Sequence, residues 1–355
     1  MFLESLSRVE PLEVPSINGF QERDMSSPVF VTGATGALGF NLIRALLDQG
    51  ASVRVILRNN EKYNNMLKNL PLDRHYGDTT NINALRQAIK GCEELYHCEE
   101  RDPFGYCSPD AYREVNVQGT NNVLQAAWER GIPRIVYASS AYAVGSGSEE
   151  HPAEETSPYN LEYLNDPYVE SRREAESLIQ EYLQKGLEIV TLNPGLLVGP
   201  GNIKPTLGRT LLQFSSFMTR FTPGGGALVS DAEDVARLSL FAMKDGVPGE
   251  RYIVGSQYVR YDALMEVVDS VLGVHPICVP VPRSLALLGA MLGDAYARAR
   301  GVPLAFFPSV SIVKRMYVEL VCSPKKATLK WGVSWTPLRD TVEKSLQWLR
   351  ENRMM

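Results

Sequence analysis

Residues 29–39 read VFVTGATGALG, and this stretch decides the fold. It opens with an apolar run typical of a buried strand, and leucine and isoleucine recur at helical spacing over residues 38–47. Between the two, Gly33 would permit a tight turn, Gly36 would let backbone approach a ligand, and Gly39 would let the helix pack on the sheet. The helix N-terminus would then offer N–H donors and a partial positive charge to a pyrophosphate. The stretch therefore predicts a strand–turn–helix that binds a dinucleotide, held by Gly33, Thr35, Gly36, Ala37, Leu38 and Gly39.

The same alternation of strands and helices continues through the first half of the chain. Strand-like runs are found at 53–57, 94–97, 134–138 and 187–192, and long helical patterns at 112–130 and from Asp166-Pro167 to Gly186. Asp before Pro is a good helix start, because Asp caps the free N–H groups and Pro suits the first turn. This alternation predicts an α/β fold, a Rossmann doubly wound parallel sheet with helices on both faces.

The regular pattern breaks after residue 194. Glycine and proline cluster at 199–205 and 223–226, and short strands are indicated at 251–254 and 277–281. We expect a smaller, irregular α/β lobe that shapes a substrate pocket. The predicted division is an N-terminal extension at 1–27, a dinucleotide-binding domain at 28–194, and a mainly substrate-binding lobe at 195–355 with some segments returning to the sheet.

The residue that ends the second strand distinguishes NAD from NADP. An acidic side chain there would bind the ribose hydroxyls of NAD, whereas arginine would accept the 2′-phosphate of NADP. This chain has Arg58 at that position. NADP is therefore the predicted cofactor, with NAD as the alternative.

Composition excludes several classes of partner. The chain has 355 residues, 44% hydrophobic and 22% charged, with a formal net charge of −5. Its basic residues are scattered, so no nucleic-acid footprint is present. No run approaches the roughly 18 apolar residues that span a bilayer. The nearest, 285–297, is interrupted by Asp294 and predicts an amphipathic helix near the pocket, with peripheral membrane contact as a minor prospect.

The five cysteines form no metal-binding pattern. None is spaced as C-x-x-C, and the adjacent His97 and Cys98 are too few to ligate a metal, so we predict no metal site. An odd, unpatterned set of cysteines is typical of a reducing compartment, which favours the cytoplasm. We interpret His97 as a structural histidine under the end of the sheet.

Further motifs carry a family resemblance. They are TGATGALG at 32–39, Gly77-Asp78-Thr79, NVQGT at 116–120, YASS at 137–140, Asn193-Pro194-Gly195 and Asp234-Val235-Ala236. With these motifs the chain resembles the extended short-chain dehydrogenase/reductase family from about Pro28 onward. Within that family it is most similar to the dihydroflavonol reductase and hopanoid-associated sugar epimerase branch. The resemblance implies that Asp78, Thr79, Asn193, Pro194 and Gly195 also contact the cofactor.

The resemblance also implies a mechanism of hydride transfer assisted by a tyrosine. Tyr168 would exchange a proton with the substrate oxygen, and Ser140 would hydrogen-bond that oxygen. A lysine four residues after the tyrosine normally binds the nicotinamide ribose and lowers the pKa of the tyrosine from about 10. Tyr142 and Leu196 are expected to join Ser140 in contacting the substrate.

Two departures from the family pattern stand out. The position of the lysine holds Arg172, which keeps the charge but places a larger, forked group there. We expect Arg172 either to face the ribose and the cofactor or to turn to a carboxylate such as Glu176. The second departure is Glu99-Glu100, where the family has small residues. A carboxylate there would repel a pyrophosphate unless it found a cation, and Arg101 and Arg113 are the expected partners.

These observations predict an NAD(P)(H)-dependent oxidoreductase with Ser140, Tyr168 and Arg172 as its catalytic set. The substrate would be a carbonyl or secondary alcohol on a fairly hydrophobic small molecule, because apolar segments at 285–292 and 303–307 are expected to line or cover the pocket. Two alternatives remain: a redox-neutral epimerase, dehydratase, isomerase or cyclase, and a non-catalytic protein that senses dinucleotide or binds a partner. The resemblance further implies a homodimer formed through the helices at 112–130 and 168–185.

Overall fold

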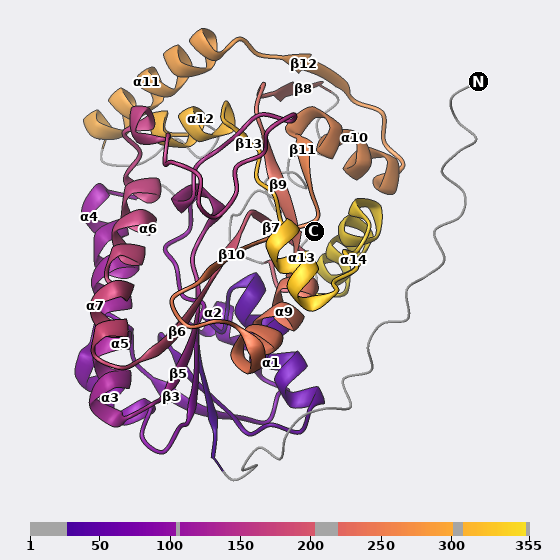
Figure 1. Cartoon of the computed structure of the whole chain (residues 1–355). Coiled ribbons are helices and arrows are strands. Elements are labelled where there is room, and N and C mark those ends of the chain that lie inside the picture. The colour runs from indigo at the N-terminus through magenta and orange to yellow at the C-terminus, as the bar shows by residue number, and fades with distance from the viewer. Residues whose placement is uncertain (1–26, 104–106, 203–218, 301–307, 353–355) are drawn as a thin grey trace.

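The structure is a computed structural model that describes residues 27–103, 107–202, 219–300 and 308–352. Almost all of the predicted N-terminal extension and the apolar segment 303–307 therefore lie outside the described residues. Figure 1 shows a single large sheet flanked by helices, with a second group of strands and helices above it.

Seven parallel strands form the main sheet, in the order β10-β6-β5-β4-β1-β2-β3. Their bounds are β1 Val29–Thr32, β2 Val53–Leu57, β3 Leu72–Tyr76, β4 Glu94–His97, β5 Arg134–Ala138, β6 Glu188–Pro194 and β10 Arg251–Val254. This order reverses direction between β1 and β4, which is the switch point of a doubly wound sheet. The predicted fold class is confirmed.

Helices cover both faces of the sheet because its strands are apolar on both sides. Val29 and Val31 of β1 pack with Leu42 on one face, whereas Phe30 packs with Leu124 on the other. The first face carries α1 Ala37–Asp48 and α9 Ala232–Asp245. The second carries α3 Ile82–Ala88, α5 Gly119–Arg130, α6 Pro167–Ser177 and α7 Ile179–Gln184 (Figure 1).

Both predicted long helices are present but interrupted, and the first begins three residues earlier than predicted. The helix expected at 112–130 consists of α4 Pro109–Tyr112, a π-helical segment η2 Arg113–Gln118, and α5. The helix from Asp166 divides into α6 and α7 around Leu178. Asp166 caps α6 as predicted, since its carboxylate accepts from the backbone N–H groups of Tyr168 and Val169. The start of α6 is thus fixed next to Tyr168.

The second half of the chain builds a smaller part and also returns to the main sheet. There β9 Gly226–Asp231 pairs with β7 Leu196–Val198, β11 Gln257–Arg260 and β13 Glu319–Leu320, and β8 Thr219–Thr222 pairs with β12 Ile277–Pro280. The helices there are α10 Tyr261–Leu272, α11 Arg283–Arg300, α12 Val310–Met316, α13 Lys325–Trp331 and α14 Leu338–Glu351. Short segments complete the fold: α2 Glu61–Asn64, η1 Asn65–Leu67, η3 Ala141–Ala143 and η4 Glu162–Leu164.

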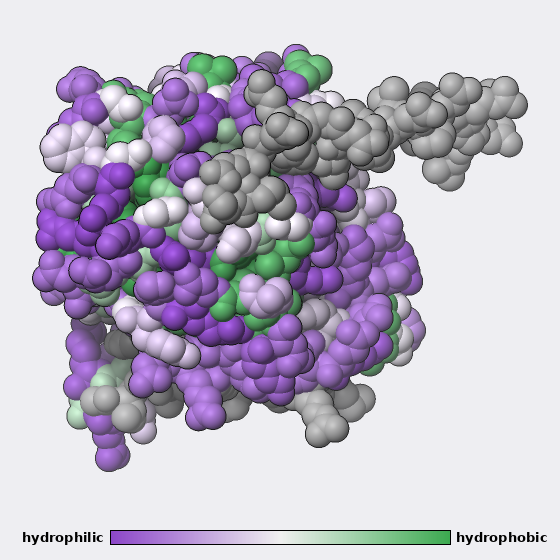
Figure 2. Space-filling view, turned by 90° about the horizontal axis from the view of Figure 1, so that it is seen from below, coloured by the Kyte–Doolittle hydropathy of each residue, from purple (hydrophilic) through white to green (hydrophobic). Residues whose placement is uncertain are grey.

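Residues 285–292, expected to line or cover the pocket, are not among its lining residues, and that they cover it stays a prediction. They belong to α11, whose apolar side chains Leu285, Leu288, Met291 and Leu292 are exposed. The buried residues of this helix are Ala290, Gly293 and Ala297, which form one narrow face, so Leu285, Leu288 and Leu292 point outward. None of the helices in the described ranges combines the length and the apolarity needed to cross a membrane. Seen from below, the surface is mostly hydrophilic, with only small hydrophobic areas between the polar residues (Figure 2).

Candidate active site

One pocket opens at the carboxyl ends of β1, β4, β5 and β6, where the sheet order reverses. This edge is the usual ligand site of an open α/β sheet. The pocket and its open mouth enclose about 1090 Å³. Predicted site residues that line it are Thr35, Gly36, Ala37, Leu38, Ser140, Tyr142, Tyr168, Pro194, Gly195 and Leu196. The glycine-loop residues and the predicted substrate contacts therefore share one cavity.

The glycine loop has the geometry that its sequence predicts. Gly33 adopts φ +70°, and a methyl group on it would overlap the backbone of Cys98. A methyl group on Gly39 would overlap the carbonyl oxygen of Gly33. At Gly36 the nearest atom to an added methyl would be 3.3 Å away, in its own loop. Gly33 and Gly39 are thus required by packing, whereas Gly36 leaves space on the pocket side.

The start of α1 fits a pyrophosphate. Gly36 is the N-cap residue, no side chain caps the helix, and its first turn carries no acidic residue. Ala37 and Leu38 of that turn line the pocket. Backbone N–H groups and the positive end of the helix dipole would therefore meet an anion directly.

Glu99 lies next to this loop, and its carboxylate is paired with a cation. Arg58 Nη2 lies 3.4 Å from Glu99 Oε1, and Arg58 Nε lies 3.6 Å from Asp78 Oδ2. Glu99 is buried, whereas 42% of the Arg58 side chain is exposed. Arg58 thus connects the ends of β2, β3 and β4 and neutralises the carboxylate beside the phosphate site. Arg58, from which NADP is predicted, therefore also removes the repulsion between the Glu99 carboxylate and a bound pyrophosphate.

The prediction that Arg101 and Arg113 pair with Glu99 and Glu100 is wrong. Arg101 donates to Cys107 Sγ at 3.0 Å, and Arg113 pairs with Glu174 at 2.6 Å, on α6. Sequence proximity favours these arginines, but the parallel sheet brings Arg58 at the end of β2, one strand removed from β4, within reach of Glu99.

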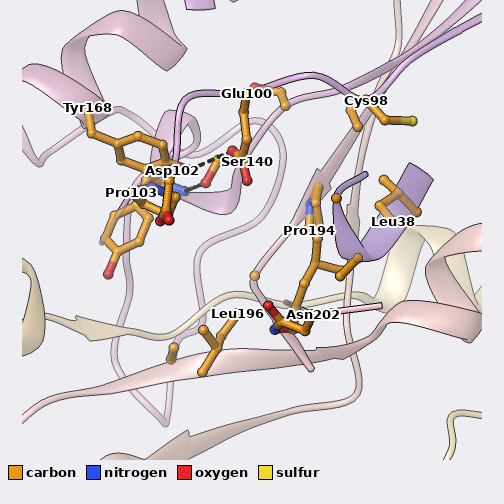
Figure 3. A pocket seen from close by; sticks show the side chains of 18 of the residues that line it. Leu38, Cys98, Glu100, Asp102, Pro103, Ser140, Tyr168, Pro194, Leu196 and Asn202 are labelled. Atoms are coloured by element: carbon orange, nitrogen blue, oxygen red, sulfur yellow. Dashed lines mark hydrogen bonds between the residues drawn. The ribbon is translucent and has the colours of Figure 1, made fainter. Parts of the chain in front are cut away.

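Glu100 instead contacts the predicted catalytic tyrosine. The Tyr168 hydroxyl donates to Glu100 Oε2 at 3.1 Å, and Ser140 is a hydrogen-bonding neighbour of the same phenol. Figure 3 shows Tyr168, Glu100 and Ser140 gathered on one side of the pocket, with the hydrogen bond between Tyr168 and Glu100 drawn as a dashed line. Glu100 is only partly buried and lines the pocket, whereas Tyr168 is 3% exposed.

The surroundings of Tyr168 keep its hydroxyl protonated. Burial raises the pKa of Tyr168 above its usual value, and the Glu100 carboxylate raises this pKa further. Arg172 and the Ser140 hydrogen bond lower the pKa, but they do not offset the first two effects. Arg172 therefore does not bring the net reduction of the Tyr168 pKa that the family lysine would bring.

Arg172 takes neither of its two expected orientations. It is completely buried, its Nη2 donates to the Ala138 carbonyl, and its guanidinium lies over the Tyr137 ring at 5.4 Å. Its Nε and Nη1 have no hydrogen-bond partner among the described residues, and it does not line the pocket. Arg172 thus lies behind the pocket wall and influences Tyr168 through its charge.

Other predicted cofactor contacts also lie behind the wall. Asn193 is buried, and its amide donates to the Ser140 carbonyl at 3.0 Å and to Glu176 Oε1 at 2.6 Å. Thr79 is completely buried under α5, which leaves Asp78 as the more accessible residue of that pair. Asn193 therefore supports Ser140 rather than facing the pocket.

His97 is structural, as interpreted from the sequence. Its Nδ1 lies 2.7 Å from Thr32 Oγ1 and its Nε2 lies 2.9 Å from Thr120 Oγ1, with its ring stacked on Tyr137. Burial and the nearby Arg172 charge lower the pKa of His97 to about 3. Within the described residues, no cluster of three or more His, Cys, Asp or Glu is arranged to hold a metal ion.

A buried ion pair at the site was not predicted. Arg315 of α12 donates through Nη1 to both Asp166 oxygens, at 2.6 and 2.8 Å, and its guanidinium lies 5.0 Å over the Tyr168 ring. Arg315 also lines the pocket. The sequence predicts Asp166 as a helix cap, and the structure confirms this. Its ion pair could not be predicted, because 149 residues separate Asp166 from Arg315 and no local pattern links the two.

Comparisons with known proteins agree with this geometry. The family model described as "NAD dependent epimerase/dehydratase family" matches residues 29–255. A putative dihydroflavonol 4-reductase of Synechocystis sp. is 31% identical, over 92% of this chain and 96% of the relative. Sterol demethylase protein B of Methylococcus capsulatus is also 31% identical, over 92% and 99%. The crystal structure of gox2253 superposes with a TM-score of 0.78 at 29% identity, over 93% and 99%.

Proposed function

The chain belongs to the NAD-dependent epimerase/dehydratase family, within the extended short-chain dehydrogenases/reductases, and we propose that it is an NAD(P)(H)-dependent oxidoreductase acting on a carbonyl or secondary alcohol. The observation that carries this proposal is the shared pocket. A pyrophosphate-type glycine loop lines it on one side, and the Ser140–Tyr168 pair lines it on the other. We divide the chain functionally into residues 28–194, which bind the dinucleotide, and 195–355, which mainly contact the substrate.

The chain's own residues handle the proton and orient the substrate oxygen. A bound reduced nicotinamide would supply the hydride. Tyr168, protonated because it is buried beside Glu100, donates its proton to the substrate oxygen. Ser140 hydrogen-bonds that oxygen, and the Asn193 amide holds the Ser140 backbone in place. Arg172 stabilises negative charge on Tyr168 from behind the wall as a positioning residue, not as a group that touches the substrate.

We propose NADP as the preferred cofactor. Arg58 is partly exposed at the end of β2, and its contacts of 3.4 and 3.6 Å to carboxylates are ion pairs too long for good hydrogen bonds. A 2′-phosphate would offer Arg58 shorter, charge-assisted hydrogen bonds. Arg58 can shift toward that phosphate while still facing Glu99.

We propose a fairly hydrophobic small molecule as the substrate. The pocket wall away from the glycine loop is largely apolar or aromatic, with Leu196, Leu197, Tyr142 and Tyr261 among its members. Two relatives are named for a dihydroflavonol and a sterol, which agrees with this wall. The apolar side chains of α11 add nothing to this wall, since Leu285, Leu288, Met291 and Leu292 face outward.

A redox-neutral reaction on the same fold is the second candidate. Glu100 next to Tyr168 gives the pocket a carboxylate that could move protons without net hydride transfer. An epimerase or dehydratase would retain its cofactor and never consume it, whereas a redox-independent isomerase or cyclase would use the pocket alone. The third prediction, a purely sensing or partner-binding protein, gains no support because both Ser140 and Tyr168 line the pocket.

The test is transfer of deuterium from NADPH labelled at C4 to a panel of hydrophobic ketones, followed by mass spectrometry. The proposal expects labelled alcohol from wild type and a large loss of label with Tyr168→Phe, which keeps the ring and removes the proton. Cofactor that co-purifies, is never consumed and still supports product formation would favour the redox-neutral candidate. No product with any ketone and no bound cofactor would contradict the oxidoreductase and the cofactor-dependent epimerase or dehydratase alike.

We further propose a cytoplasmic homodimer. All five cysteines are free, which suits a reducing compartment. The outer faces of α5 and α6–α7 carry the proposed interface, where Trp128 is 46% exposed. Light scattering of wild type and Trp128→Glu tests the dimer, and a wild-type monomer would contradict it.

Peripheral membrane contact through the exposed apolar side chains of α11 stays a prediction. Vesicle flotation tests it, and recovery of the protein only in the soluble fraction would count against it.

A further inference from the structure

Glu100, which departs from the family pattern, places a second ionisable group next to the Tyr168 hydroxyl that would transfer the catalytic proton. The position follows β4 in the chain, and the carboxylate reaches Tyr168 on α6, 68 residues later in the sequence. The phenol is buried, whereas Glu100 is partly exposed and lines the pocket. Glu100 therefore lies between a proton donor that solvent barely reaches and the solvent of the pocket.

We propose that Glu100 is a catalytic residue of this site, the outer member of a two-residue proton relay with Tyr168. This proposal rests on the oxidoreductase function proposed above. In alcohol oxidation, the substrate O–H bond breaks as the proton moves to Tyr168 Oη, and the Tyr168 proton moves to Glu100 Oε2. A bound oxidised nicotinamide would take the hydride from the carbon, and Glu100 releases its proton to solvent.

Carbonyl reduction runs the same path backwards. The Tyr168 O–H bond breaks to give the substrate oxygen its new O–H bond, while a bound reduced nicotinamide would supply the hydride to the carbonyl carbon. Glu100, protonated from solvent, then returns a proton to the Tyr168 oxygen. Each step moves one proton along a single hydrogen bond, so no further reactant is needed.

The charges around the phenol explain why a relay is needed. The charged groups that act on the Tyr168 hydroxyl are Glu100 from the β4 loop, Arg172 from α6 and Arg315 from α12. Burial and Glu100 hold the pKa of Tyr168 above its usual value, so a free phenolate is costly. Passing the proton onward to Glu100 as it arrives avoids that phenolate.

The contacts of Glu100 also favour a catalytic role over the alternative that its side chain merely obstructs the cofactor site. Glu100 already uses its carboxylate on Tyr168 within the described structure, and the other carboxylate of the pair, Glu99, is held away by Arg58. The hydrogen bond of 3.1 Å is within the range for proton transfer between side chains.

The first test needs no cofactor. Protein labelled with 13C at tyrosine Cζ gives a signal for Tyr168 that Tyr168→Phe assigns by its loss. Glu100→Ala removes the acceptor and should move this signal, whereas Glu100→Gln keeps an acceptor oxygen and should move it less. A Tyr168 signal unchanged in both variants would overturn the proposal, because the two groups would then not be in contact.

The second test uses turnover with the ketone identified by the deuterium experiment. We expect Glu100→Gln to lower kcat by about 10²-fold while the NADPH affinity measured by calorimetry stays unchanged. Acetate should restore activity to Glu100→Ala but not to Glu100→Ala/Tyr168→Phe, because the relay needs the Tyr168 hydroxyl. For the same reason Glu100→Gln should lower kcat little further in a protein that already carries Tyr168→Phe.

The outcomes distinguish failure of the Glu100–Tyr168 relay from failure of the proposed oxidoreductase function on which it rests. Wild type that transfers no label would refute the proposed function, while the Cζ signal would still report the contact. Normal turnover by Glu100→Gln would overturn the relay alone. Tighter NADPH binding together with faster turnover in Glu100→Ala would also overturn it, since Glu100 would then be an obstruction.

Discussion

Replacing Asp166 by Asn removes one charge from the buried ion pair that holds the catalytic helix to α12. Arg315 donates to both Asp166 oxygens at 2.6 and 2.8 Å, and the two side chains are 2% and 0% exposed. The Asn side chain retains an oxygen that can cap α6, as Asp166 does for Tyr168 and Val169. The substitution therefore isolates the charge from the cap.

The expected cost follows from leaving Arg315 buried without its counter-charge. Breaking a buried pair by removing one partner destabilises a protein by about 3–5 kcal/mol. Asp166→Ala should cost about 1 kcal/mol more, because the helix cap is also lost. Asp166→Asn/Arg315→Met leaves no buried charge, so it should be less destabilised than the two single variants added together.

Denaturant unfolding followed by fluorescence of the four tryptophans measures these differences. The exposed pair of Arg86 and Glu129, also at 2.6 Å, supplies the matched control. Glu129→Gln should shift the midpoint much less than Asp166→Asn. Equal shifts in these two variants, or strictly additive effects in the double variant, would refute the reasoning.

Three further predictions follow from single residues. His97 has a pKa of about 3 in the folded protein against 6.5 in the unfolded chain. The stability that the neutral, buried imidazole contributes is therefore fully present above pH 6.5 and is lost as the pH falls toward 3. Unfolding at pH 7 and pH 4 should show wild type losing about 3 kcal/mol more than His97→Asn, and parallel pH curves would contradict this. Gly33→Ala should abolish NADPH binding in calorimetry, whereas Gly91→Ala, also at positive φ but with open space around it, should not. Arg58→Ala should weaken NADPH about tenfold more than it weakens NADH, since both lose the neutralisation of Glu99 and only NADPH loses the contact to its 2′-phosphate. An equal loss for both would remove Arg58 from cofactor selection.

Local sequence signals predicted the parts of the fold that depend on neighbouring residues. The glycine loop was found because Gly33 and Gly39 meet steric demands that only glycine satisfies. The start of α6 was found because Asp166 and the following proline act within one turn. The edge strand β3 was missed, since LDRHY has no buried face and hence no alternation of apolar residues.

Long-range contacts could not be predicted in the same way. Arg58 reaches Glu99 only because β1 lies between β2 and β4 and brings their carboxyl ends to one edge. Glu100 was recognised as a departure, yet its contact with Tyr168 depends on how a loop and a helix meet above the sheet. The exposure of α11 depends on its packing partners, which its amphipathic pattern alone does not identify.

Calorimetric titration of purified protein with NADPH and with NADH tests the central claim most directly, namely that this pocket holds a nicotinamide dinucleotide on the glycine loop. The account predicts micromolar binding of NADPH at one site per chain, weaker binding of NADH, and loss of both in Gly33→Ala. Absence of heat with either nucleotide, from folded wild-type protein, would contradict the claim.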